Sequence, residues 1–185
     1  MWLHVNDLSE VKDLYYSVMP EFDRNETLLR EFPDQYRAFC FYSSRESDIR
    51  ATLYKSRPLA FAVICDLPKT QTLVIDLFAL DISVRKKGYA RQIFWNLIVR
   101  LPYLWPEIKD YCNRWILEAY IHNVEPWCKI MIMTPVDTKI KSMYLDRPIK
   151  LLQHNVIDAE NAYKEWHEFQ LKWYNSNKTK KIAKL

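Results

Sequence analysis

The residues with the clearest chemical potential lie in a short basic segment near the middle of the chain. Arg85, Lys86 and Lys87 precede Gly88, and Arg91 follows three positions later. Gly88 is the only glycine among the 185 residues, whereas average usage would give about 13. A single retained glycine indicates a position where the backbone needs a conformation, or a ligand needs an approach distance, that a Cβ atom would forbid.

The sequence on either side of this segment predicts a strand that leads into a helix. Residues 72–80 form a nearly continuous apolar run, typical of a buried strand. From Gly88 to about Pro102, apolar residues recur at helical spacing, and their stripe consists of Tyr89, Ile93, Phe94, Leu97, Ile98 and Leu101. A helix N-terminus has unpaired N–H groups and favours anions. The junction therefore predicts a site for a phosphorylated ligand, although a basic helix N-terminus without any ligand would show the same pattern.

Two carboxylates lie inside apolar runs and are candidates for acid–base chemistry. Asp76 falls within residues 72–80, and Glu118 falls within the strand predicted for residues 115–121. Burial would raise their pKa values toward the range in which a general base works. The alternative is that both are paired structural charges or lie at sheet edges.

Further strands and one crossover complete the predicted sheet. Strands are expected at 2–5, 59–65, 72–80, 115–121 and 149–152, with a weaker one at 51–54. Turn-forming residues at 66–71 predict an antiparallel hairpin. The helix between the strands at 72–80 and 115–121 predicts a right-handed crossover between parallel strands. The sheet should therefore be mixed, in an α/β (α+β) fold flanked by helices.

The helices outside the crossover are less uniformly marked. Asp7 and Glu10 have the spacing of a capping box for a helix that Pro20 ends. A second helix is expected from about 25 to 32, resuming after Pro33. Residues 124–133 fit either a short helix or an apolar strand. Asp158 should cap a last helix with its apolar face packed on the sheet or on another subunit; that face carries Ala159, Ala162, Trp166, Phe169 and Trp173.

Composition narrows the class of protein. The net charge of +4 permits an anionic ligand but does not favour nucleic acid binding. No run of about 18 apolar residues predicts a membrane span, and the N-terminal residues do not resemble a secretory signal. The four cysteines are widely spaced, which indicates reduced thiols, no metal site and a cytoplasmic location.

The segment from Leu80 to Ala90 resembles the acetyl-CoA loop of the GNAT superfamily of acyl-CoA N-acyltransferases. Arg85, Gly88 and Ala90 match the loop's motif, and Leu80 matches the apolar strand end that precedes it. The resemblance implies a GNAT fold with a β-α-β core that binds acetyl-CoA through the loop's amides and the strand-end backbone. The implied cofactor contacts are Leu80, Ile82, Arg85, Lys86, Lys87, Gly88, Tyr89, Ala90, Arg91 and, from a second segment, Asn123.

That second segment is the end of the strand after the crossover. Leu117-Glu118-Ala119 followed by Asn123 keeps the spacing of the family's pantetheine-contacting Asn. The family's acid, a Tyr seven residues after that Asn, is replaced here by Ile130. Tyr120, Tyr144 or solvent is the alternative acid. The expected catalytic residues are Asp76, Glu118 and Tyr120.

The resemblance implies an enzyme that transfers an acyl group, chiefly acetyl, from CoA to a primary amine by direct attack. The missing Tyr leaves open a catalytically silent acyl-CoA-binding module on the same fold. We expect an acyltransferase domain over residues 1–156 and a C-terminal helix with a basic tail over 157–185. The sequence does not specify the amine acceptor. A homodimer is compatible with the resemblance, and no membrane partner is predicted.

Overall fold

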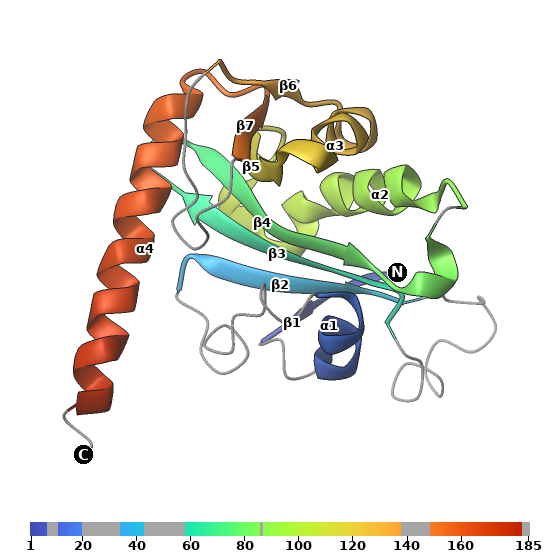
Figure 1. Cartoon of the computed structure of the whole chain (residues 1–185), viewed down its shortest axis with the longest axis horizontal. Coiled ribbons are helices and arrows are strands. Elements are labelled where there is room, and N and C mark those ends of the chain that lie inside the picture. The colour runs from blue at the N-terminus through green and yellow to red at the C-terminus, as the bar shows by residue number, and fades with distance from the viewer. Residues whose placement is uncertain (7–10, 20–33, 43–57, 86, 138–148, 183–185) are drawn as a thin grey trace. The chain divides into compact units, whose positions relative to one another are not determined.

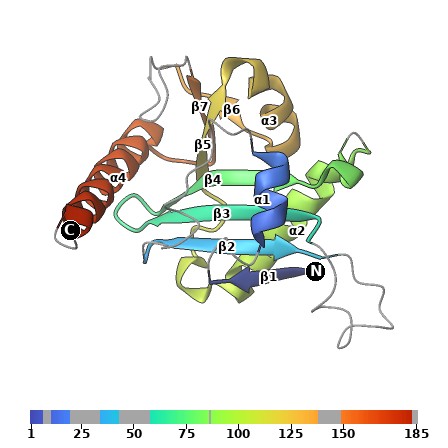
Figure 2. The same cartoon turned by 60° about the horizontal axis from the view of Figure 1, so that its bottom comes forward.

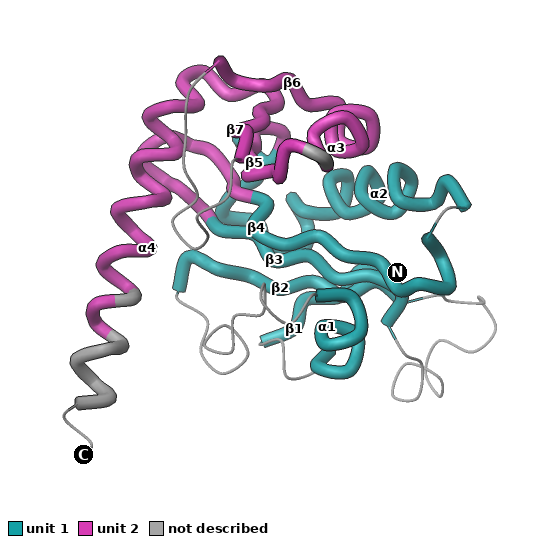
Figure 3. Tube along the Cα trace, in the orientation of Figure 1, with its two compact units in different colours: residues 1–65, 75–112 teal, residues 66–74, 113–185 magenta. Residues whose placement is uncertain are grey.

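The computed structural model describes residues 1–6, 11–19, 34–42, 58–85, 87–137 and 149–182 (Figure 1). Contacts divide the chain into two compact units, coloured separately in Figure 3. The first unit contains Met1–Cys65 and Ile75–Cys112, and the second contains Asp66–Val74 and Asn113–Leu185. The domain boundary expected near residue 156 stays a prediction.

The described strands form a mixed seven-stranded sheet in the order β1-β2-β3-β4-β5-β7-β6. They are β1 (Trp2–Val5), β2 (Tyr36–Phe41), β3 (Ala60–Leu67), β4 (Thr72–Leu80), β5 (Trp115–Tyr120), β6 (Thr134–Pro135) and β7 (Ile149–His154). β1–β2, β2–β3, β5–β7 and β6–β7 are antiparallel. β4 and β5 are parallel, with Leu73 opposite Trp115. The mixed α/β sheet and its parallel crossover are therefore confirmed.

Four α-helices are present in the described residues: α1 (Lys12–Val18), α2 (Tyr89–Leu104), α3 (Val124–Met131) and α4 (Ala159–Ile182). In the described residues, larger elements are also connected by short 3₁₀ turns, namely η3 (Ile82–Val84), η4 (Pro106–Ile108) and η5 (Ile121–Asn123). The segment that fitted either a helix or a strand is thus the helix α3, and it has Pro126 in its first turn, where no intrahelical N–H is lost.

In the first unit, α1 and α2 lie on opposite faces of β1–β3 (Figure 2). α2 buries Ile93, Phe94, Leu97, Ile98 and Leu101, as its stripe predicts. The indole Nε1 of Trp2 donates to the carbonyl of Ile93 at 3.0 Å, which joins β1 to α2. On the α1 side, the buried Tyr15 packs on Phe61 of β3. Both faces of this part of the sheet are therefore covered.

In the second unit, α4 is attached to the strands by two carboxylate contacts. Glu165 accepts hydrogen bonds from the backbone N–H groups of Lys69 and Thr70 and from the Thr70 hydroxyl, the last at 2.7 Å. Tyr163 donates to Glu118 of β5 at 2.6 Å. The N-terminus of α4 is capped by Asp158, whose Oδ1 accepts from the Asn161 N–H at 3.0 Å. The expected cap is confirmed. Of the expected apolar face, Ala159, Ala162 and Trp166 are buried, whereas Phe169 and Trp173 are only partly buried.

Three expectations differ from the structure. The residues after Pro33 form β2 and do not resume a helix, because all six residues of β2 pair with β3. α2 continues past Pro102, which lies inside its last turns. Tyr89 is 47% exposed, since it starts the helix ahead of the buried stripe. The sequence pattern could not identify β2 in advance, because short apolar runs fit helix and strand alike.

Some expectations fall on residues that are not described. These are the capping residues Asp7 and Glu10, the helix at 25–32 and the strand at 51–54. In the described part of α1, Val11 is the N-cap and makes no side-chain cap hydrogen bond.

Three residues other than glycine have a positive φ in the described segments: Gln71 (φ 49°), Ile132 (φ 51°) and Asn155 (φ 52°). Ile132 is the C-cap of α3, where glycine is the usual residue. Its carbonyl accepts a hydrogen bond from His154 Nδ1 at 2.7 Å. The His154 ring stacks on buried Trp115, with 4.2 Å between ring centroids. These contacts hold a backbone conformation that a β-branched residue disfavours.

Candidate functional site

The basic segment lies at the junction between β4 and α2, as its sequence predicts. β4 ends at Leu80, η3 follows, and Gly88 is the N-cap of α2 with φ 76° and ψ 0°. A Cβ atom built on Gly88 would meet no other atom within 4 Å. The glycine is therefore explained here by its left-handed backbone, which side chains disfavour, and the space beside it is open.

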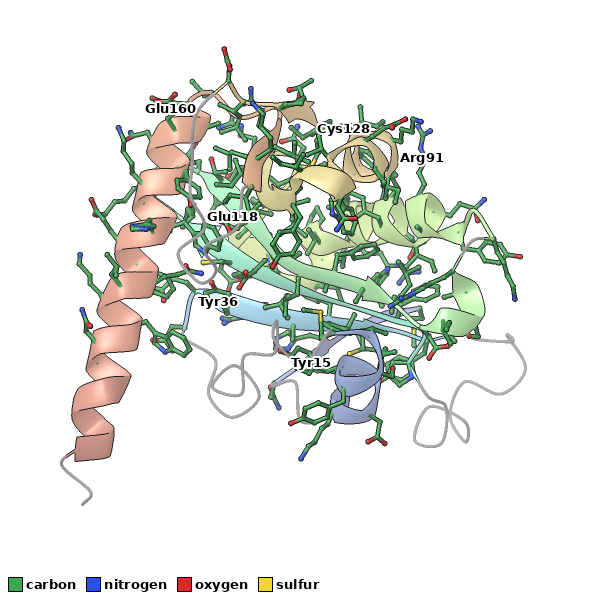
Figure 4. All side chains as sticks on the ribbon, viewed as in Figure 1. Tyr15, Tyr36, Arg91, Glu118, Cys128 and Glu160 are labelled. Carbon is green, nitrogen blue, oxygen red and sulfur yellow. The ribbon has the colours of Figure 1, made fainter. Side chains whose placement is uncertain are left out.

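The N-terminus of α2 is electrostatically suited to an anion. No side chain caps it, and its first turn has no acidic residue. Arg85, Lys87 and Arg91 are exposed around it, and Arg91 extends outward from the helix (Figure 4). The first N–H groups of a helix have no carbonyl partner within it. Positive charge and open N–H donors therefore meet at one place, while Lys86 lies outside the described residues.

The turn between β4 and this N-terminus is closed by its own hydrogen bonds. Asp81 is buried, and its Oδ1 accepts from the Ser83 N–H at 2.9 Å. Arg85 Nε donates to the Leu80 carbonyl at 2.8 Å. The side chain of Ile82, between these residues, is 80% exposed. The turn is therefore held in shape by its own hydrogen bonds and presents an apolar side chain to solvent.

Asp76 lies in β4, in the first unit, and is partly buried. Burial removes water from its carboxyl group and raises its pKa to about 6. A hydrogen bond from the hydroxyl of Tyr36 opposes that rise. Tyr36 is a buried residue of β2 (Figure 4) that pairs with Cys65 of β3. The group therefore changes its charge close to neutral pH.

Glu118 lies in β5, in the second unit, and accepts the hydrogen bond from Tyr163. Burial raises the pKa of the Tyr163 hydroxyl, and the hydrogen bond to Glu118 raises it further. The proton accordingly stays on the tyrosine. Of the two alternatives for Glu118, the paired structural charge fits this arrangement.

The remaining expected residues of the second unit lie at and beyond the end of β5. Tyr120 is the last residue of β5, and Asn123 ends η5 and serves as N-cap of α3. Ile130 is in α3. Tyr144, the other expected acid, lies outside the described residues.

Sequence reasoning missed Tyr36, Asp81 and Tyr163. Tyr163 was detectable, because it lies one turn after Ala159 and places a polar group on the apolar face of α4. Asp81 directly follows an apolar strand, a position where an aspartate can form an Asx turn with the backbone N–H two residues on. Tyr36 had no local signal, since its partner Asp76 is distant in sequence.

In the described residues, no helix is long and apolar enough to cross a membrane. The same part of the chain has no group of three or more His, Cys, Asp or Glu side chains arranged to hold a metal ion. Its four cysteines are free thiols, with Cys40 and Cys65 buried.

No protein-family model matches the sequence, and no curated protein matches it. Solved structures do match the fold. A Bacillus subtilis acetyltransferase in complex with CoA aligns with a TM-score of 0.53 and 14% identity, over 84% of this chain and 98% of that one. A dodecameric spermidine N-acetyltransferase from Vibrio cholerae aligns with a TM-score of 0.55 and 9% identity, over 83% and 91%. The chain thus adopts the fold of the GNAT acetyltransferases.

Proposed function

We propose that the chain is an N-acyltransferase that moves an acyl group, chiefly acetyl, from CoA to a primary amine in a ternary complex. The observation that carries this proposal is the uncapped, glycine-started N-terminus of α2 at the end of β4. Its open N–H groups and nearby cations suit a pyrophosphate. The match in fold to an acetyltransferase that binds CoA supports the same assignment.

In this proposal, the pyrophosphate binds the N–H groups at Gly88, Tyr89 and Ala90. Lys86, Lys87 and Arg91 supply positive charge around it. The strand-end residues Leu80 and Ile82 border the pantetheine arm, and Asn123 contacts the pantetheine. The exposed apolar side chain of Ile82 is then covered when the cofactor is present.

Asp76 is the proposed general base. The acceptor amine is an ammonium ion in water, so it must lose a proton before its nitrogen can attack the thioester carbonyl carbon. A carboxyl group with a pKa of about 6 is mostly ionised at neutral pH and is more basic than an ordinary aspartate. The C–N bond forms, the C–S bond breaks, and the CoA thiolate then takes a proton from Tyr120 or from water. Glu118 is the second candidate base.

Binding of CoA is the first test. Acetyl-CoA at 100 times its dissociation constant should stabilise the protein by about 2.7 kcal/mol and raise its melting temperature. Turnover with a panel of amines, led by spermidine because of the Vibrio cholerae neighbour, distinguishes an enzyme from a silent binder. Binding without turnover of any amine would favour the silent acyl-CoA-binding module, for which Ile130 in place of the usual Tyr is the supporting observation.

Substitution of Gly88 tests the loop itself. Gly88→Asn should fold, because Asn tolerates a left-handed backbone and the space around position 88 is open. Its side chain would occupy the pyrophosphate position and abolish CoA binding, and Gly88→Trp should do the same. Asn155→Gly is a control at another left-handed position and should bind CoA as the wild type does. Tight CoA binding by Gly88→Trp would refute the assignment.

The oligomeric state of the protein needs an experiment separate from the amine panel. The Vibrio cholerae neighbour is described as dodecameric, which supports a test of oligomeric state by sedimentation for this chain. A homodimer remains the prediction.

A further inference from the structure

We infer that the cofactor loop consists of two parts with different tasks. Residues 81–85, the closed turn, fix the shape of the loop, and residues 87–91, the receiving segment, bind the anion. Asp81, through its carboxylate, and Arg85, through its Nε, are then positioning residues. This inference rests on the proposed CoA site and refines it.

The backbone donors of the closed turn are already used within it. The Ser83 N–H donates to Asp81 Oδ1 at 2.9 Å. The Val84 N–H donates to the Asp81 carbonyl at 3.1 Å, and the Arg85 N–H donates to the Ile82 carbonyl at 3.3 Å. A phosphate that took any of these donors would have to break an existing hydrogen bond. These N–H groups are therefore poor phosphate ligands.

The closed turn is also anchored at both ends. The Asp81 N–H donates to the Leu59 carbonyl at 2.8 Å, which fastens the turn to the start of β3. Arg85 Nε donates to the Leu80 carbonyl at 2.8 Å. Both polar groups of the Leu80–Asp81 peptide unit are thus engaged by the protein. Because a guanidinium group is planar, this bond also fixes the orientation of the Arg85 head group.

The charge of Asp81 supports its structural role. Asp81 is only 5% exposed and carries a carboxyl group in a loop proposed to receive an anion. A negative charge there opposes anion binding. The carboxyl group is explained by its hydrogen bond to the Ser83 N–H, which an uncharged amide oxygen could also accept.

The receiving segment has the opposite character. Gly88 starts a 16-residue helix without a side-chain cap or an acidic residue in its first turn. Lys87 and Arg91 are exposed on either side. These two side chains, together with the positive charge of the exposed Arg85, should therefore supply the salt-dependent attraction of the pyrophosphate, whereas the position of the Arg85 Nε donor sets the shape of the turn.

The test measures CoA affinity by calorimetry at low salt and at physiological salt, about 0.15 M. Asp81→Asn keeps the acceptor and removes the charge, so CoA should bind as tightly as to the wild type or tighter. Asp81→Ala removes the acceptor and should weaken binding about tenfold, the equivalent of one lost hydrogen bond. Equal losses in Asp81→Asn and Asp81→Ala would overturn the role of Asp81.

A second pair of variants distinguishes the effect of the Arg85 charge from the effect of its Nε donor. Arg85→Lys keeps the charge, whereas Arg85→Met removes charge and donor. Both should weaken CoA binding by about tenfold or more, but only Arg85→Met should also reduce the ratio of affinities at the two salt concentrations. Arg91→Gln is the control that should reduce this ratio. The KM for acetyl-CoA should rise in both Arg85 variants, with the KM for the amine unchanged.

Wild-type-like binding in Arg85→Lys would show that Arg85 acts through its charge alone and would overturn its positioning role. Failure of the wild type to bind CoA would instead refute the proposed function. The two failures are therefore distinguishable.

Discussion

Two carboxylates in two units of the molecule have the same local pattern and different surroundings. Asp76 and Glu118 each lie in an apolar strand, and each accepts a hydrogen bond from a tyrosine. The partner of Asp76 is Tyr36, on a strand of the same sheet, whereas the partner of Glu118 is Tyr163, on α4. The roles that we propose for these two carboxylates therefore differ according to the element that carries the tyrosine.

The physical difference lies in which group is perturbed. For Asp76, loss of hydration outweighs the bond from Tyr36, so the pKa of the carboxyl group rises to about 6. For the second pair, burial and Glu118 together raise the pKa of Tyr163, so its proton is held firmly. The first pair can exchange a proton near neutral pH, and the second pair attaches a helix.

The largest expected contrast is in catalysis. Asp76→Asn should lower kcat by about 10²- to 10⁴-fold, the usual contribution of a general base. Glu118→Gln should change kcat by less than about tenfold, because its proposed task is to hold α4. Steady-state kinetics with acetyl-CoA and an accepted amine measures both, with CoA affinity as a control for folding. A larger loss in Glu118→Gln would exchange the two roles.

The difference in stability between Asp76→Asn and the wild type should depend on pH. The pKa of Asp76 in the folded protein, about 6, exceeds the ordinary aspartate value of 3.8, so ionisation destabilises the fold. Wild-type stability should therefore fall as pH rises from about 4 to about 6 and stay lower above that range. Asp76→Asn lacks this loss and should be more stable than the wild type at pH 7 by about 1–3 kcal/mol. Urea unfolding at several pH values tests this, and a constant difference would contradict it.

Tyr163→Phe should behave in the opposite way and destabilise the protein. It removes a hydrogen bond to a charged group, which contributes about 1.5–3 kcal/mol, while kcat stays near the wild-type value. Tyr103→Phe is a matched control, because Tyr103 is 84% exposed and its loss should change stability little. An unfolding midpoint equal to that of the control would show that α4 does not depend on this bond.

The smallest expected effect is in the pH profile of Tyr36→Phe. In the wild type, kcat/KM should rise with pH and level off above about 6, as Asp76 loses its proton. The bond from Tyr36 lowers the pKa of Asp76, so its removal should shift the midpoint of the profile upward. The profile of Tyr103→Phe should be unchanged. A downward shift would contradict the assignment of Asp76 as the base.

The sequence allowed prediction of the elements with a strong local pattern. The strands β3, β4, β5 and β7, the buried stripe of α2 and the capped start of α4 belong to this group, as does Gly88 at the strand-to-helix junction. Each depends on periodicity, turn chemistry or a cap within a short window.

The remainder depended on contacts distant in sequence. β2 is a strand because it pairs with β1 and β3, and its own six residues do not reveal that. The Tyr36–Asp76 bond joins residues of different strands, and the Tyr163–Glu118 bond joins a helix to a strand. Asp76 and Glu118 could be selected as candidates from their apolar surroundings, but their roles could not be separated without these partners.

The left-handed backbone of Ile132, at the end of α3, offers a route to a more stable variant. Ile132 adopts a conformation that costs a β-branched residue about 1–2 kcal/mol, and Ile132→Gly would relieve it while keeping the carbonyl that His154 binds. Glycine's greater freedom in the unfolded chain offsets part of that gain, leaving a few tenths to about 1 kcal/mol. The position lies at the opposite end of α3 from Asn123, so engineered heat tolerance there should leave the proposed cofactor contacts intact.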